Sequence, residues 1–156
     1  MKIEKNLINP NIEKKFEFFE VTADIGYWAY GNTLEEAFEN AALAMFDVIT
    51  NVQKIAKNET REISVESEDK ISLLYDFLEE LLILHEIDLI LFSEFEVKIL
   101  SDKIDGNGNY KLKASLTGEY IDWDKHERKS EVKAVTFHMM KVLCDTICKV
   151  RVILDL

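Results

Sequence analysis

Residues 92–117 read FSEFEVKIL, SDKIDGNGN and YKLKASLT in succession. The first and last of these segments alternate apolar and polar side chains, which is the period of a β-strand with one buried face. The glycines and asparagines of residues 105–109 suit a tight turn between them, because these residues tolerate positive φ angles. We therefore expect an antiparallel hairpin built from strands 92–100 and 110–117.

The turn also has the start of a calcium-binding pattern. Asp105, Asn107 and Asn109 occupy the first three ligand positions of an EF-hand loop. The pattern then fails, because Tyr110 stands where the loop needs Gly and Leu116 stands where it needs a bidentate Glu. A plain hairpin turn is the favoured interpretation.

Two helices are expected before this hairpin. Thr33 followed three residues later by Glu36 forms a capping box, and apolar residues continue at helical spacing to about Ile49. A second helix opens at Ser67 or Asp69 and runs to about Glu86. Its apolar residues cover more than one face, so we expect it to be largely enclosed by a sheet or by another helix.

The remaining segments favour strands. Aromatic, β-branched or alternating runs occupy residues 16–21, 26–31, 60–67, 131–140 and 147–154, with a polar break at residues 22–25 and a turn near residues 144–146. Clustered strands with two separate helices predict an α+β fold with mainly antiparallel pairing. We expect one compact domain over residues 1–156, with residues 1–14 as a loose leader.

Charge and hydropathy exclude several classes of protein. The 156 residues contain 19 Lys and Arg against 30 Asp and Glu, a net charge of −11 that repels nucleic-acid phosphates. A basic protein or a cation is therefore the expected partner, and strong direct nucleic-acid binding is not expected. Charged residues interrupt the most apolar segment, residues 71–92, so no membrane span is expected. The N-terminal segment has no signal-peptide pattern, which favours the cytoplasm.

The cysteines and histidines give no catalytic pattern. Cys144 and Cys148 fit no standard zinc spacing, although a turn between them would make them neighbours across two strands. Reduced core cysteines are our interpretation. We expect His85 to be a satisfied, half-buried imidazole in the second helix, and His138 alone supports no function.

Two carboxylates lie at positions that could meet. Asp24 lies in the break between the first two strands, and Asp155 follows the last apolar run, directly before Leu156. Oxygen anions brought together repel one another unless a hard cation such as Ca²⁺ or Mg²⁺ joins them. With 30 acidic residues in the chain, ordinary surface carboxylates are the competing interpretation.

A set of short motifs occurs in a fixed order along the chain. They are Thr22-Ala23-Asp24-Ile25-Gly26, Ala29-Tyr30-Gly31, Thr33-Leu34-Glu35-Glu36-Ala37-Phe38, the segments 73–81 and 92–95, Gly118-Glu119, the segment 131–138, and the terminal Val152-Ile153-Leu154-Asp155-Leu156. In this order, from about residue 16 to residue 156, the chain resembles the archease family.

The resemblance implies a function that composition does not. Archeases are non-enzymatic activators of the RtcB-type RNA ligase of tRNA splicing, and they promote guanylylation of the ligase and its multiple turnover. The family's metal ligands correspond to Asp24, Asp155 and Leu156, with Ca²⁺ as the usual ion or another hard cation such as Mg²⁺ in its place. The chain departs from the family at Val21, where His is frequent, and at Phe137, where Tyr is common.

Two other classes of function remain as alternatives. An acidic domain with aromatic surface could act as a chaperone-like module that binds basic proteins. A metal-dependent hydrolase using Asp24 and Asp155 is the second alternative, although no base and nucleophile set accompanies them.

Overall fold

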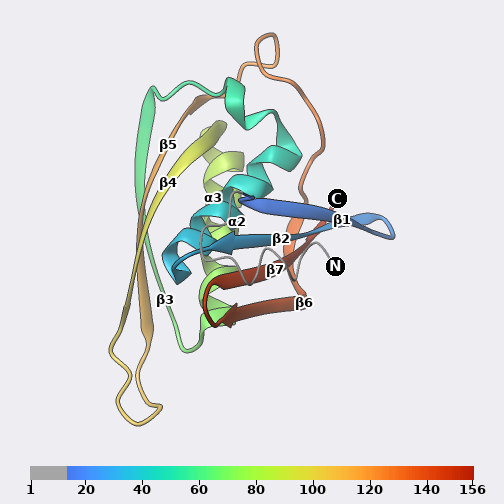
Figure 1. Cartoon of the computed structure of the whole chain (residues 1–156). Coiled ribbons are helices and arrows are strands. Elements are labelled where there is room, and N and C mark those ends of the chain that lie inside the picture. The colour runs from blue at the N-terminus through green and yellow to red at the C-terminus, as the bar shows by residue number, and fades with distance from the viewer. Residues whose placement is uncertain (1–13) are drawn as a thin grey trace.

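The computed structural model describes residues 14–156 and shows two antiparallel sheets with two long helices between them (Figure 1). The strands are β1 (Phe16–Val21), β2 (Asp24–Gly31), β3 (Glu59–Ser67), β4 (Ile90–Ser101), β5 (Tyr110–Tyr120), β6 (Ala134–Cys144) and β7 (Cys148–Asp155). The helices are α2 (Leu34–Ile49), α3 (Lys70–Asp88) and the short 3₁₀ helix η1 (Val52–Lys54). The α+β, mainly antiparallel fold predicted from sequence is confirmed, whereas the predicted leader lies almost wholly outside the described residues.

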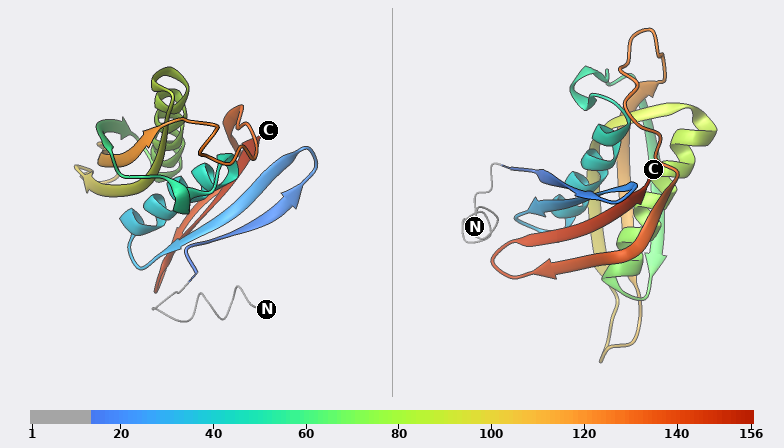
Figure 2. Two further views of the ribbon diagram at one scale, coloured as in Figure 1. Left: turned by 90° about the horizontal axis from the view of Figure 1, so that it is seen from above. Right: turned by 90° about the vertical axis from the view of Figure 1, so that its right-hand side faces the viewer.

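One sheet has the strand order β1-β2-β7-β6 and the other has the order β3-β5-β4. Helix α2 contacts β2 and β7 on one side and β4 on the other, and α3 contacts β6 as well as β3. The view from above shows this layering of sheet, helix pair and sheet (Figure 2). The shared core of large apolar side chains therefore lies around the two helices.

The helix starts follow the sequence signals. The Thr33 hydroxyl accepts the Glu36 N–H at 3.1 Å, and the Glu36 carboxylate accepts the N–H of Asn32 at 3.1 Å. Asp69, one of the two candidates, caps α3 by accepting the Ser72 N–H at 2.7 Å. Helix α3 was expected to be largely enclosed, and it does contact strands of both sheets, but Ile71, Ile83 and Ile87 are exposed, so the enclosure is incomplete.

The predicted 92–117 hairpin is present as β4 and β5, and residues 102–109 form the turn between them. Ile104 and Asn107 form an antiparallel bridge around Asp105 and Gly106, whose φ angles of 51° and 81° suit a tight two-residue turn, as the plain-turn interpretation predicts. The β4 strand has a bulge between Phe92 and Glu94, where the register against β5 shifts.

The expectation that a turn would make the two cysteines cross-strand neighbours is confirmed, but the interpretation as reduced core cysteines is wrong. Cys144 and Cys148 are direct partners across the β6–β7 turn, with a Cα–Cα distance of 4.1 Å, and they form a disulfide. The β6–β7 turn brings the two sulfurs together, and only Cys148 is buried. The two cysteines therefore form one cross-link at the end of the β6–β7 hairpin, and they are not two reduced thiols in the core.

His85 is placed as expected. Its Nδ1 lies 2.8 Å from the carbonyl oxygen of Ile90, and its ring packs edge-on against Phe46. None of the helices in the described part of the chain has the length and apolar character that crossing a bilayer requires.

Candidate functional site

The two candidate carboxylates meet at one end of the four-stranded sheet. Asp24 is the first residue of β2, Asp155 is the last residue of β7, and the two are direct partners in the antiparallel register. In both figures the C-terminus lies beside the β1–β2 turn (Figures 1 and 2). We call Asp24, Asp155 and Leu156 the acidic tip.

The register also fixes the face on which the carboxylates lie. The Tyr27 hydroxyl donates to the Ala41 carbonyl oxygen of α2 at 2.8 Å, so Tyr27 points toward the helices. Because side chains alternate along a strand, Asp24 points to the opposite, outward face. Directly opposed residues share a face with Cβ atoms about 5 Å apart, so both carboxylates lie on this outward face.

The turn before Asp24 is short and conformationally demanding. Val21 pairs with Asp24, which leaves only Thr22 and Ala23 in the loop. Ala23 has a φ angle of 63°, in the left-handed region that costs a residue with a Cβ about 1 kcal/mol. The sequence placed Asp24 in a break between strands, whereas the structure places it inside the β2 ladder, where the backbone holds it against β7.

The donor set of the acidic tip fits a hard divalent cation. Two carboxylates on one face repel one another in the absence of a counter-charge, and carboxylate and carbonyl oxygens are the ligands that Ca²⁺ and Mg²⁺ prefer. Within residues 14–156, no three His, Cys, Asp or Glu side chains are grouped to hold a metal. An ion at the tip would therefore need an oxygen of Leu156, together with water or a partner's atoms, to complete its coordination.

The surface beside the acidic tip is hollowed and partly apolar. Phe18, Phe19, Val21 and Leu156 contribute to its lining, together with Asp24. Phe18 is more than one-third exposed although it is aromatic. A partner that approached the tip would find apolar surface next to the carboxylates.

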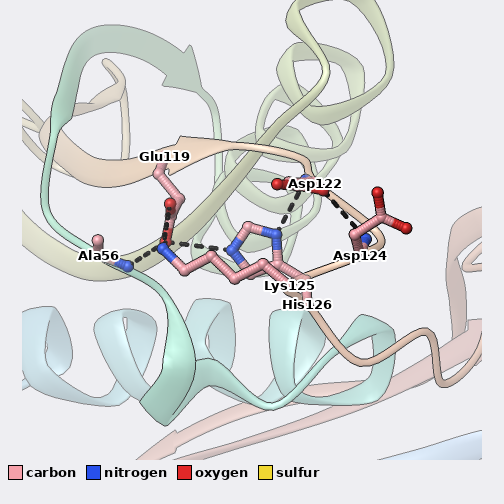
Figure 3. A network of polar contacts seen from close by, with 6 residues as sticks. All are labelled: Ala56, Glu119, Asp122, Asp124, Lys125 and His126. Atoms are coloured by element: carbon pink, nitrogen blue, oxygen red, sulfur yellow. Dashed lines mark hydrogen bonds and ion pairs between the residues drawn. The ribbon is translucent and has the colours of Figure 1, made fainter.

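A second polar cluster, which the sequence did not predict, lies at the end of β5 (Figure 3). The Glu119 carboxylate, 8% exposed, accepts hydrogen bonds from Lys125 Nζ at 2.7 and 2.9 Å and from the backbone N–H of Ala56. His126, 3% exposed, places Nε2 3.1 Å from the same carboxylate, at an angle that gives an electrostatic contact rather than an in-line hydrogen bond.

The hydrogen bonds of His126 determine its tautomer. Its Nδ1 accepts the backbone N–H of Asp122 at 3.0 Å, so the proton of the neutral ring is on Nε2 and faces Glu119. Only the motif Gly118-Glu119 marked this region in the sequence. The spacing from Glu119 to His126 matches no catalytic or metal pattern, and Ala56 is distant along the chain.

The cluster predicts a specific dependence of stability on pH. Burial alone would raise the pKa of Glu119, but the hydrogen bonds from Lys125 and Ala56, together with the close contact of His126, outweigh burial and lower the pKa from 4.5 to about 2. A lowered pKa stabilises the folded state above pH 4.5, and this stabilisation is lost as the pH falls toward 2. Because Lys125 is half exposed and solvent weakens its interaction with Glu119, we expect the stabilisation above pH 4.5 to be roughly 2 kcal/mol.

This prediction can be checked by urea unfolding between pH 7 and pH 2.5. The free energy of unfolding of the Glu119→Gln variant should lie below that of the unchanged chain at pH 7. The difference should shrink as the pH falls below 4.5. A difference that stayed constant down to pH 2.5 would contradict the assignment.

His138 and Phe137 lie in an irregular part of β6. The register against β7 shifts between Thr136 and Lys141, and Met139 has a φ angle of 55°. Phe137 is exposed but stacks on Tyr75 of α3, with ring centroids 3.9 Å apart. The bulge gives β6 an irregular, twisted edge, which discourages pairing with another chain.

Comparison with known proteins identifies relatives over nearly the whole chain. The model of the archease protein family matches residues 16–156. Protein archease from Methanothermobacter thermautotrophicus is 56% identical over 144 residues, which are 92% of this chain and 99% of that protein. Protein archease from Pyrococcus abyssi is 56% identical over 129 residues, which are 83% of this chain and 88% of that protein.

A solved structure is similar as well. The solution structure of Methanobacterium thermoautotrophicum protein 1598 superposes with a TM-score of 0.80 at 53% sequence identity. The superposition covers 91% of this chain and 99% of the other.

Proposed function

Because this chain belongs to the archease family, we propose that it is a non-enzymatic activator of an RtcB-type RNA ligase in tRNA splicing. The observation that carries the proposal is the family match over residues 16–156. In this role the chain promotes guanylylation of the ligase and allows each ligase molecule to turn over repeatedly.

The charge of the chain supports a protein partner. A ligase that binds RNA must present a basic cleft, and a chain with a net charge of −11 complements such a surface. Complementary charge accelerates docking more than it tightens the complex. The acidic chain therefore acts in RNA ligation by contacting the ligase rather than the RNA.

The acidic tip supports the mode of action. Asp24, Asp155 and an oxygen of Leu156 would hold Ca²⁺ or a similar hard cation, and the ion would supply positive charge that lets two opposed carboxylates coexist. The β2–β7 ladder holds the two aspartates side by side. The apolar hollow beside them offers contact area to the ligase.

A guanylylation assay tests the proposal. The ligase is incubated with GTP and the chain at one-tenth and at one equivalent, and covalent guanylate on the ligase is measured over time. We expect faster guanylylation at both ratios, because an activator that is released can serve several ligase molecules. Equal rates with and without the chain would overturn the proposal.

The chaperone-like alternative rests on the exposed aromatic surface at Phe137 and its stack on Tyr75. It predicts that the chain suppresses aggregation of many unrelated basic proteins. Turnover of a phosphate ester by the chain alone, without ligase, would instead favour the hydrolase alternative.

A further inference from the structure

The acidic tip is connected to the Glu119 cluster by residues 121–133, which we call the strap. The strap leaves the end of β5, crosses the end of α2 and enters β6. It contains no helix or strand, yet the structure fixes it at four successive points.

The first anchor is the Glu119 cluster itself (Figure 3). Lys125 and His126 belong to the strap, and both reach back to the carboxylate of Glu119 on β5. The N–H of Asp122 donates to His126 Nδ1, and the N–H groups of Lys125 and His126 donate to the carbonyl oxygen of Asp122. The beginning of the strap is thereby folded into a compact turn around a buried carboxylate.

The second anchor is the C-terminal end of α2. The N–H of Lys129 donates to the carbonyl oxygen of Ile49 at 3.0 Å, and the N–H of Ser130 donates to that of Val48 at 3.2 Å. The last carbonyls of a helix have no partner within it, so the strap satisfies two of them. Lys129 Nζ adds a hydrogen bond to the carbonyl oxygen of Asp47 at 3.0 Å.

The third anchor is Val132, which is 3% exposed and belongs to the shared core. The fourth is at the acidic tip, where the N–H of Lys133 donates to the carbonyl oxygen of Asp155 at 2.8 Å. The next residue, Ala134, is the register partner of Asp155 in the β6–β7 ladder. The strap therefore ends on the backbone of one proposed ion ligand.

We propose that Glu119 and His126 are positioning residues for the acidic tip, acting through the strap that ends on Asp155. The Glu119 cluster fixes where the strap begins, and the Lys133–Asp155 hydrogen bond transmits that position to the end of β7. With the first anchor lost, the strap moves more freely and the hydrogen bond from the Lys133 N–H to the Asp155 carbonyl oxygen opens more often, while β6 and β2 still pair with β7. The carboxylate then samples orientations that do not match Asp24.

The ion-binding part of this inference rests on the proposed function, but the positional part does not. Removing a residue that orients a metal ligand typically weakens metal binding by about 10- to 100-fold. We expect the Glu119→Gln variant to bind Ca²⁺ roughly tenfold more weakly. We also expect the Lys133 amide to exchange its hydrogen about tenfold faster, because the local opening that releases the strap becomes easier.

The experiment combines amide exchange at Lys133, followed by NMR, with Ca²⁺ titration calorimetry on the full chain. The control is Ile63→Ala on β3, in the other sheet, which lowers stability without touching the strap. We expect Ile63→Ala to leave both the Lys133 exchange rate and the Ca²⁺ affinity unchanged, even where its free energy of unfolding is as low as that of Glu119→Gln. If Glu119→Gln does not fold, His126→Asn is the milder variant, because its amide oxygen can still accept the Asp122 N–H.

Unchanged exchange at Lys133 in both cluster variants would overturn the inference, and so would equal effects in the Ile63→Ala control. A chain that bound no Ca²⁺ even without substitutions would contradict the ion in the proposed function. The Lys133 exchange rates would still decide whether the cluster positions the tip.

Discussion

Replacing both Asp24 and Asp155 by Asn is expected to abolish ligase stimulation and to weaken Ca²⁺ binding about 100-fold or more, since ligand charge dominates the affinity of calcium sites. The substitution keeps the size and shape of both side chains and removes two negative charges. Guanylylation of the ligase measures the first effect, and titration calorimetry with Ca²⁺ measures the second.

The same double variant is expected to gain stability although it loses ligase stimulation and Ca²⁺ binding. Like charges directly opposed across two strands destabilise a sheet, so without divalent cations the double variant should be more stable by about 0.5 kcal/mol. The matched control is Asp105→Asn with Asp145→Asn, which removes two charges from turns away from the tip. An equal loss of stimulation in the control would mean that net charge, and not the tip, is what the ligase requires.

Replacing Gly118 by Ala is expected to cause the largest loss of stability. A Cβ atom at this position would lie 1.8 Å from the carbonyl oxygen of Leu91 and 2.8 Å from the Cα atom of Phe92. Both are backbone atoms of β4 next to its bulge, so no side-chain rotation relieves the overlap. Since overpacking a core by a methylene costs about 1–3 kcal/mol, a clash with backbone should cost about 3 kcal/mol or more.

Gly106→Ala is the matched control in urea unfolding. A Cβ at Gly106 meets no heavy atom within 4 Å, but its φ angle of 81° lies in the left-handed region, so only the conformational cost of about 1 kcal/mol applies. Gly118→Ala should therefore lose much more stability than Gly106→Ala. Similar losses in the two variants would show that β4 can shift to accommodate the added methyl group.

Much of the fold could be predicted because its signals are local. The capping box at Thr33, the alternation in residues 92–100 and the glycine turn each involve neighbouring residues, and the structure confirms all three. Strand ends were less accurate, since β2 begins at Asp24 rather than at Gly26. Pairing with β1 and β7, rather than local propensity, extends the strand over Asp24.

The polar clusters could not be predicted in the same way. The carboxylate of Glu119 binds Ala56 from another part of the chain, and no sequence period encodes that contact. The turn between Cys144 and Cys148 was expected, but neither composition nor spacing showed that the two neighbouring thiols would be joined in a disulfide. The positions of Asp24 and Asp155 suggested that the two residues could meet, but only the family resemblance favoured this over ordinary surface carboxylates, because strand alternation does not choose a partner strand.

The pairing of β2 with β7 has a consequence for how the chain is made. Until the ribosome has synthesised residues 148–155, the β1–β2 hairpin has a free edge of unpaired amide and carbonyl groups. Contacts between segments far apart in the sequence form slowly, because a long segment must be closed into a loop. A chain released before residues 148–156 are made therefore keeps this edge unpaired, which exposes it to aggregation, and retains only Asp24 of the acidic tip.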